Sequence, residues 1–549
     1  MNCCLRLFLV AAALAVTAPL GAAPKPPAPA SVAALERAVV LAQDKEKKAT
    51  EAVAAFAAAV AADPDHLKAH EALQKFKEDL RLAAFRNKEL QPVADAVNKA
   101  IEGHYAAWEK QHPDSIGIQY AIGSRLYAEE DPRAKTYLLQ VVAHDPSFAR
   151  AWFMLAIDAE RWGDEKGGSA YMLKASQAEP ANPDYAFYHA SGLDAVAPER
   201  WEAASRDVAK RFPTSERGAQ ALYWLGQKSH DDAKRIAVWE QARVDFPPAK
   251  FNWTVSSMSG LFDAYLRTAP DKAVALAKDL ISLGGDSGNL WKTRAAFAET
   301  FVEVRSLAAA GRFPEAKAKL DQLPVDRRSS NPVMTLLLKA EVIAGAGEVA
   351  AAYDLLAQRC AASPEDEVCA ALAGYGARLG KSAAQVDADV WAKRDASAKP
   401  APGFNLGLYT SDQSLSLASL RGKVVFLTFW FPGCGPCRAE FPHFENVMAH
   451  FRGQDVVYLG INGIRSQDDY VLPFMAGTKY SFIPLKGDKD VISPQAYAVR
   501  GYPANFLIDR EGRIVFSNFR AHDPQSELVL QRMIESLLAR PAAASAAGQ

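Results

Sequence analysis

Two cysteines, Cys434 and Cys437, flank a Gly-Pro pair in the stretch FLTFWFPGCGPCRAEFPHF, and this spacing is the strongest chemical signal in the chain. The apolar residues before them predict a strand, and the residues after them predict a helix. A thiol just before the first helical turn meets unpaired backbone N–H groups and the positive end of the helix dipole, which stabilise its thiolate. Pro436 presets the first turn. The pattern predicts that Cys434 attacks a disulfide and that Cys437, one turn later, resolves the mixed disulfide.

Other uses of a paired cysteine motif fit less well. A zinc knuckle needs two more ligands at suitable spacing, and only His443 is near. A c-type haem site needs a histidine directly after the second cysteine, where Arg438 stands. The spacing alone does not exclude a purely structural disulfide, but such a bond leaves the strand, turn and helix around it unexplained. We predict no metal and no cofactor.

The length of the chain bounds the number of domains, and its charge bears on nucleic-acid binding. The chain has 549 residues, more than one hydrophobic core usually supports, so we expect at least two domains. It carries 63 Lys and Arg against 64 Asp and Glu, a formal net charge of -1. That balance, with no basic stripe, excludes nucleic acid as an expected partner.

The N-terminus has the pattern of a secretory signal, which we assign to residues 1–23. Arg6 precedes an apolar run at 7–16, and small residues at 21–23 offer a cleavage site. The run is shorter than the ~20 apolar residues of a membrane span, so an uncleaved anchor is the less favoured alternative. A Pro-rich spacer follows at 24–30. We expect a periplasmic or secreted protein.

A second cysteine pair, Cys360 and Cys369, flanks the stretch AASPEDEV. Ser363 can cap a helix there, so we expect the two thiols to lie across a helical hairpin. An exported chain meets an oxidising compartment, where disulfides persist. We predict a structural disulfide worth on the order of 2–3 kcal/mol. A redox role and two unpaired buried thiols are the alternatives.

Residues 31–393 predict helix after helix, with Ala, Leu, Glu, Lys and Arg at helical spacing. Prolines that follow the expected helix ends are 33, 34, 33 and 34 residues apart, at Pro113, Pro146, Pro180, Pro213 and Pro247. The stretch AWFMLAIDAERWGDEKGGSAYMLKASQAEP resembles the tetratricopeptide pattern. We expect a degenerate solenoid whose groove holds a protein or peptide. A non-repeating helical bundle, acting as a spacer or dimerisation unit, is the alternative.

Residues 394–401 shift to Ala, Lys and Pro and suggest a linker, and residues 541–549 suggest a disordered tail. Between them, at 402–540, strand-like stretches alternate with helical ones and predict an α/β domain. The strand-like stretches are KVVFLTFW, DVVYLGIN, ANFLID and RIVFSNF.

Two stretches resemble the TlpA/ResA-like thioredoxin family. The first, PGFNLGLYTSDQSLSLASLRGKVVFLTFWFPGCGPCRAEFP, is similar to that family's P-x-F-x-L opening, its sLxxLrGKvV strand and its FW…C-x-x-C-R-x-E-x-P segment. The second, VRGYPANFLIDREGRIV, is similar to the family's V-x-G-x-P…FLID-x-x-G-x-I segment. The resemblance covers about Pro402 to Leu538. It implies a thioredoxin fold and thiol–disulfide exchange.

By this resemblance Cys434 matches the attacking cysteine, Cys437 the resolving one, and Pro503 the cis-proline that presents backbone to an incoming peptide. Four residues are expected to face the substrate: Gly435, Pro436, Tyr502 and Trp430. Thioredoxin itself carries the same Gly-Pro pair, which favours a reductant over a strong oxidant.

The chain also departs from the family. Gly433 stands where thioredoxins place a tryptophan, and Thr428 stands where they place a buried aspartate that helps to move protons. The glutamate that some members carry after the second strand has no clear match in GINGIRSQ. Proton transfer would then depend on another group or on water.

The expected function is an exported thiol–disulfide oxidoreductase that reduces protein disulfides. Its expected partners are a protein disulfide substrate, an electron-donor thiol protein and a protein or peptide held by the helical repeats. The alternative is a non-enzymatic binding scaffold whose thioredoxin-like domain is redox-inactive.

Overall fold

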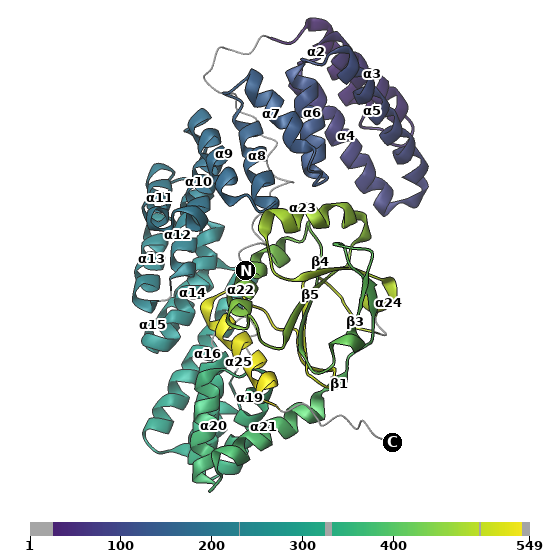
Figure 1. The fold of residues 1–549 in the computed structure, drawn as a ribbon. Coiled ribbons are helices and arrows are strands. Elements are labelled where there is room, and N and C mark those ends of the chain that lie inside the picture. The colour runs from purple at the N-terminus through teal and green to yellow at the C-terminus, as the bar shows by residue number, and fades with distance from the viewer. Residues whose placement is uncertain (1–25, 230, 324–331, 494–495, 541–549) are drawn as a thin grey trace. The chain divides into compact units, whose positions relative to one another are not determined.

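The described residues between Pro29 and Ser397 are mostly helical, and a mixed sheet with its own helices follows (Figure 1). The computed structural model describes residues 26–229, 231–323, 332–493 and 496–540. The predicted signal peptide and the predicted tail lie outside these residues. The chain divides into two compact units, with the boundary between Ala204 and Ser205. Among the described residues no helix combines the length and apolarity that a membrane span needs.

The first unit is helical throughout its described part. Its helices are α2 (Pro29–Leu41), α3 (Ala49–Ala62), α4 (Leu67–Arg86), η2 (Lys88–Leu90), α5 (Gln91–Gln111), α6 (Ile116–Ala128), α7 (Ala134–His144), α8 (Ala149–Arg161), α9 (Glu165–Ala178) and α10 (Pro183–Val196). Helix α11 (Pro198–Arg211) spans the boundary. The helices of the second unit before its sheet are α12 (Glu216–Lys228), α13 (Asp232–Asp245), α14 (Asn252–Thr268), α15 (Pro270–Leu280), η3 (Ile281–Leu283), α16 (Gly285–Ala309), α17 (Phe313–Leu320), α18 (Pro332–Gly345), α19 (Val349–Ala362), α20 (Asp366–Arg378) and α21 (Ala383–Ser397).

The proline period seen in the sequence recurs in the helix ends. Helices α5, α7, α9, α11 and α13 end at residues 111, 144, 178, 211 and 245, which are 33, 34, 33 and 34 residues apart. A proline stands two residues after each of these ends, where it cannot continue the helix. Polar caps start several of the following helices, since Ser115 accepts the N–H of Ile118 and Asn182 accepts that of Asp184. Helix pairs therefore recur at the predicted spacing.

The C-terminal part contains a six-stranded sheet in the order β1-β8-β7-β4-β5-β6. Strands β4, β5 and β6 are parallel, whereas β7 runs antiparallel to β4 and β8 antiparallel to β7. The strands are β1 (Lys399–Pro400), β4 (Val424–Trp430), β5 (Val456–Asn462), β6 (Ile483–Lys486), β7 (Ala504–Ile508) and β8 (Arg513–Ser517), and β2 (Asn405–Gly407) pairs with β3 (Ser414–Ser416) apart from them. The helices are η4 (Leu417–Leu420), α22 (Gly435–His450), η5 (Arg465–Gln467), α23 (Asp468–Thr478), α24 (Lys489–Ile492) and α25 (Pro524–Ala539).

Strand β4 forms the centre of this part, and all seven of its residues are buried. It is bonded to β5 on one side and to β7 on the other, and such a strand is expected to be a continuous apolar run. On one face Phe426 packs against Phe444 of α22, and α22 lies beside α25 through a contact between His443 and Glu527 (Figure 1). A helical region followed by an α/β thioredoxin-type fold, as predicted, is confirmed.

The segment 394–401 is not a separate linker. Residues up to Ser397 belong to α21, and Lys399 and Pro400 form β1, so Ala398 alone separates helix from sheet. Pro400 is compatible with a strand because β1 is the sheet's edge. The composition suggested a loop because alanine, lysine and proline are common there, but tertiary packing overrides that preference.

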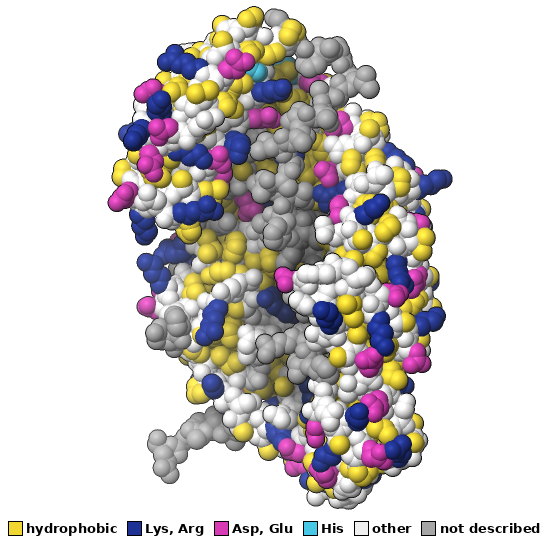
Figure 2. All heavy atoms as spheres, turned by 180° about the vertical axis from the view of Figure 1, so that it is seen from behind, with side chains coloured by type: hydrophobic (Ala, Val, Ile, Leu, Met, Phe, Trp, Pro, Cys, Tyr) yellow, Lys and Arg dark blue, Asp and Glu magenta, His cyan; other side chains and the backbone are white. Residues whose placement is uncertain are grey.

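Charges on the molecular surface are mixed in sign. On the face that Figure 2 shows, Lys and Arg side chains lie among Asp and Glu side chains rather than gathering into one patch. This distribution agrees with the formal net charge of -1.

Candidate active site

The two cysteines of CGPC lie where strand β4 ends and helix α22 begins. Cys434 is the N-cap residue of α22, and its Sγ accepts the backbone N–H of Cys437 at 3.2 Å. Pro436 lies in the first helical turn. The two cysteines form a disulfide with a Cα–Cα distance of 5.3 Å, and both are buried. The two cysteines of the predicted motif are therefore disulfide-bonded at a helix N-terminus. Unpaired N–H groups there favour a thiolate once the disulfide is reduced.

The Tyr502–Pro503 peptide bond is cis, as the family resemblance implies. Pro503 directly precedes β7, the strand that neighbours β4 in the sheet. The ring of Tyr502 meets the ring of Phe431 edge to face, with centroids 5.3 Å apart. Tyr502 also donates its hydroxyl to the carbonyl of Gly463 at 3.2 Å. Because the N–H of Cys434 bonds the carbonyl of Phe431, the aromatic pair lies next to CGPC.

Trp430 does not face a substrate, contrary to the prediction. Its side chain is fully buried, with ring contacts to Phe441, Phe474 and Phe482. It is the last residue of the central strand, and alternation along that strand points it into the layer beneath α22. The other three expected substrate-facing residues differ in exposure, since Gly435 is buried whereas Pro436 and Tyr502 are half-buried.

A buried carboxylate, that of Glu440, lies one helical turn after Cys437. Its Oε2 accepts a hydrogen bond from Asn505 Nδ2 at 3.0 Å, and its Oε1 accepts one from Arg520 Nη1 at 3.0 Å. Asn505 in turn accepts the hydroxyl of Thr428 at 2.8 Å. Burial raises the pKa of Glu440, and the Arg520 guanidinium opposes that rise. Residues three apart share one face of a helix, so this carboxyl lies on the side of α22 that carries Cys437.

Sequence reasoning missed Glu440 because it looked for an acid on the strand, where Thr428 stands. The available signal was the spacing of the glutamate from Cys437, three residues further along the predicted helix. Phe441 and Phe444 nearby mark this stretch of the helix as buried, and a charged residue beside buried ones is a candidate for a shifted pKa. The buried polar network thus connects the strand position with the helix position.

Gly433, the residue before Cys434, is hydrogen-bonded to the loop after β5. Gly433 donates its N–H to Gln467 Oε1 at 2.7 Å. Gln467 is the last residue of η5, in the loop after β5. The buried side chain of Asn462 holds this loop through hydrogen bonds. Asn462 Oδ1 accepts the N–H of Ile464 at 3.1 Å, and its Nδ2 donates to the hydroxyl of Tyr409 at 2.9 Å. This chain of bonds gives the CGPC turn a defined support, which the sequence did not reveal.

The second cysteine pair is also bonded. Cys360 and Cys369 form a disulfide with a Cα–Cα distance of 5.6 Å, between the last turn of α19 and the second turn of α20. This is the hairpin position that the sequence predicted. Within the described residues, no group of three or more His, Cys, Asp or Glu side chains is arranged to hold a metal ion.

A family model matches the C-terminal part of the chain. Residues 398–517 match the model of the AhpC/TSA family. The thiol-disulfide oxidoreductase ResA of Bacillus subtilis is 37% identical over 116 residues, which are 21% of this chain and 63% of ResA. The ResA of Halalkalibacterium halodurans is 35% identical over 103 residues, 19% of this chain and 57% of that protein. The chain thus spans less than two thirds of the length of these two relatives.

Among solved structures, the thioredoxin domain of a thiol-disulfide oxidoreductase from Bacteroides vulgatus is similar to this part. It is 25% identical with a TM-score of 0.23, and the match covers 26% of this chain and 96% of that one. By sequence, residues 398–517 match the AhpC/TSA family, and the C-terminal part has ResA-like homologues.

Proposed function

We propose that this protein is an exported thiol–disulfide oxidoreductase that reduces disulfides in client proteins through Cys434 and Cys437. One observation carries the proposal: the Sγ of Cys434 is at the N-cap of α22 and accepts the N–H of Cys437 at 3.2 Å. The same N–H and the helix dipole would stabilise the thiolate of reduced Cys434, so this sulfur is the nucleophile.

The exchange proceeds in two steps that conserve electrons. The Cys434 thiolate attacks one sulfur of the client disulfide, a mixed disulfide forms, and the other client sulfur leaves and takes a proton. Cys437 then attacks the sulfur of Cys434, which releases the second client thiol and closes the Cys434–Cys437 disulfide. Two electrons have passed to the client. A thiol protein that acts as electron donor must return two electrons before the next cycle.

Glu440 is proposed to accept the proton of Cys437 before that second attack. Cys437 is fully buried, so its proton cannot pass directly to bulk water. A carboxyl with a raised pKa, on the same face of α22 and one turn away, is a suitable proton acceptor. This assignment replaces the buried aspartate that thioredoxins carry at the position of Thr428.

Pro503 and its neighbours are proposed to receive the client backbone. Pro503 directly precedes β7, and β7 pairs with β4, the strand that leads into CGPC. Pro436 and Tyr502 remain half-buried and so keep surface for contact. An extended client segment would lie along these residues with its disulfide next to Cys434.

The test is the redox midpoint of the full chain after equilibration with glutathione or dithiothreitol, with thiols alkylated and assigned by peptide mass. Peptide assignment separates Cys434 and Cys437 from the Cys360–Cys369 disulfide. A reversible two-electron couple at CGPC that disappears in Cys434→Ser supports the proposal and sets the direction of exchange. A CGPC disulfide that resists every reductant would instead support the redox-inactive scaffold.

The helical region is proposed to recruit a protein partner, on the strength of its recurrent helix pairs. Stacked helix pairs form extended concave surfaces that hold peptides or proteins. Client proteins trapped as mixed disulfides by Cys437→Ser would be compared between the full chain and residues 398–540, after circular dichroism has checked that the shorter chain is folded. Identical clients trapped at identical yields would refute recruitment.

Export is supported by the Cys360–Cys369 disulfide, because structural disulfides persist in oxidising compartments. The N-terminal mass of the protein purified from its natural cells tests this. A mature chain that begins near Pro24 is the expected result, and an intact Met1 would contradict cleavage.

A further inference from the structure

A buried arginine, Arg394, connects the end of the helical region to the thioredoxin-type fold. It lies on α21 and is 4% exposed. Its Nε donates to the carbonyl of Ala361 at 3.2 Å, and its Nη2 donates to the carbonyl of Cys360 at 3.3 Å. Its guanidinium lies 4.9 Å from the ring centroid of Trp391 and 5.2 Å from that of Phe516 on β8. One side chain thus contacts the last turn of α19 and the sheet together.

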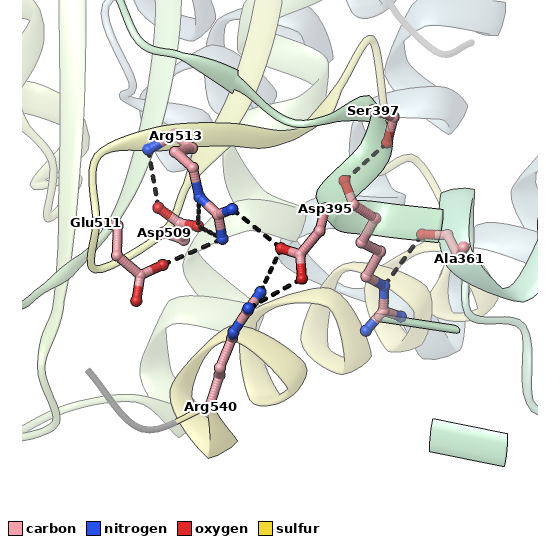
Figure 3. Close-up of polar contacts among 8 residues, drawn as sticks. Ala361, Asp395, Ser397, Asp509, Glu511, Arg513 and Arg540 are labelled. Atoms are coloured by element: carbon pink, nitrogen blue, oxygen red, sulfur yellow. Dashed lines mark hydrogen bonds and ion pairs between the residues drawn. The ribbon is translucent and has the colours of Figure 1, made fainter. Parts of the chain in front are cut away.

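The next residue, Asp395, binds two arginines of the thioredoxin-type fold (Figure 3). Its Oδ1 lies 3.0 Å from Arg513 Nη1 and 2.6 Å from Arg540 Nη1, and its Oδ2 accepts from Arg540 Nη2 at 2.9 Å. Arg513 belongs to β8 and is also bound by the carboxylates of Asp509 and Glu511. Arg540 follows α25 directly. We refer to Arg394 and Asp395, with their partners Arg513, Phe516 and Arg540, as the junction.

The hairpin closed by the second disulfide supplies the rest of the contact. Cys360 lies in the last turn of α19, and its own carbonyl is one of the two acceptors of Arg394. On α20, Asp366 accepts from Arg532 Nε of α25 at 3.1 Å. The Cys360–Cys369 bond ties these two helices together where they meet the junction. One helix of the bonded hairpin, α19, therefore contacts Arg394 on α21, and the other, α20, contacts α25 of the thioredoxin-type part.

The Cys360–Cys369 disulfide matters because the carbonyls at the end of α19 must stay in place to accept hydrogen bonds from the buried guanidinium of Arg394. A buried charge that loses its acceptors is strongly disfavoured, since water cannot replace them without opening the packing. Burial already lowers the pKa of Arg394 to about 10. If the last turn of α19 frays, Arg394 must leave its site between Trp391 and Phe516 to reach water.

We propose that the Cys360–Cys369 disulfide holds the junction closed, and that its reduction releases α21 from the thioredoxin-type fold. The reductant is a dithiol, such as dithiothreitol or a protein dithiol. Its thiolate attacks the sulfur of Cys369, the half-buried member of the pair, and Cys360 leaves as a thiolate that takes a proton. The second thiol of the reductant then resolves the mixed disulfide, so the chain gains two thiols and the reductant becomes a disulfide. This device does not depend on turnover at CGPC.

Hydrogen exchange on the full chain tests the proposal. The double variant Cys434→Ser/Cys437→Ser is used, so that the Cys360–Cys369 bond is the one that responds to dithiothreitol. Amides in the last turns of α21 and in the β1–β8 pair are expected to exchange at least ten-fold faster after reduction. Amides of the central β4–β5 pair are expected to keep their rates, because no junction residue lies there. Mass spectrometry reports the extent of reduction.

Three results would overturn the proposal. The first is a disulfide that dithiothreitol does not reduce in the folded protein. The second is faster exchange confined to α19 and α20, with α21 unchanged, which would make the bond a local staple. The third is faster exchange in β4 and β5 as well, which would mean that the bond holds the whole fold.

Variants that leave the Cys434–Cys437 bond intact provide matched controls. Cys360→Ala/Cys369→Ala should show fast exchange at α21 without reductant and no further change with it. Asp395→Asn removes the ion pairs of the junction and should also raise exchange at α21 and β1. Asp271→Asn makes the same substitution at an exposed position of α15, away from the junction, and should change neither rate. Equal effects of the two aspartate substitutions would contradict the role of Asp395.

Discussion

The substitution Glu440→Gln separates a chemical role of this carboxyl from a structural one. A glutamine keeps the shape, and its carbonyl can still accept from Asn505 Nδ2, which now bonds Oε2 at 3.0 Å. The amide nitrogen cannot accept from Arg520, so one charge-assisted hydrogen bond is lost. The Arg520 side chain is 46% exposed and regains water, and the cost of burying a carboxylate disappears. The net loss of stability should therefore be about 1 kcal/mol or less.

The chemical effect should be much larger than this. Without a proton acceptor, Cys437 must ionise unaided, and a positioned general base contributes roughly 10²-fold or more to a rate. We expect the mixed disulfide between Cys434 and a client to persist about 100 times longer in Glu440→Gln. The pH dependence of its decay should also change, because the wild-type rate rises as Glu440 ionises above its raised pKa.

The assay mixes reduced protein with a disulfide-containing client, quenches with acid and follows the mixed disulfide by mass over time. Urea unfolding of the same samples measures stability. Glu445→Gln is the matched control. Glu445 lies on the same helix, but its carboxylate accepts a hydrogen bond from the backbone N–H of Ser481. An unchanged decay rate and pH profile in Glu440→Gln would refute the proton-transfer role. Equal slowing in both variants would show that the effect is not specific to this carboxyl.

Three further predictions concern stability. Trp430→Ala should destabilise the thioredoxin-type part by about 3–5 kcal/mol in urea, and weaker client binding at unchanged stability would contradict our assignment of its ring to the core. Asn462→Ala should cost about 1–3 kcal/mol in the same assay, because Tyr409 and Ile464 lose a buried partner, whereas no change would mean that the loop is held otherwise. Burial lowers the pKa of His70 to about 4, so the unfolded state binds the proton first as the pH falls below 6.5. The first unit should then lose about 2 kcal/mol in urea between pH 7 and pH 5, and an equal loss in His70→Gln would contradict this origin.

The sequence predicted those features that local pattern determines. The CGPC motif identified its strand and helix because a thiol pair, a proline in the first turn and an apolar strand all lie within twenty residues. The prolines predicted the helix ends to within two residues, since a proline cannot continue a helix. The position of the Cys360–Cys369 bond followed from the short stretch between the two cysteines, although Ser363, the expected cap of the second helix, is instead the C-cap of α19, and α20 begins after Glu365.

Features that depend on partners far apart in the chain were missed or misassigned. Glu440 acquires its role through Asn505, 65 residues later, and no local pattern shows that contact. The family resemblance places Trp430 at the substrate face, whereas strand alternation directs its ring into the core. The composition of 394–401 suggests a linker, whereas Asp395 binds Arg513 and Arg540, 118 and 145 residues further on, which no local pattern shows.

The direct connection between α21 and β1 changes how any recruitment by α12–α21 would act. A flexible linker would let the dithiol sample many positions, and its effect would be an effective concentration set by linker length. Here Ala398 is the single residue between helix and strand, and Asp395 is bound from β8 and from the end of α25. A client held on α12–α21 would therefore meet the dithiol in a fixed orientation, and would be reduced at those disulfides that this geometry brings to Cys434. Loosening the junction should broaden the set of reduced disulfides rather than lower the intrinsic rate at CGPC. A Cys360→Ala/Cys369→Ala chain that reduces the same sites of a multi-disulfide client, in the same proportions, would contradict this view.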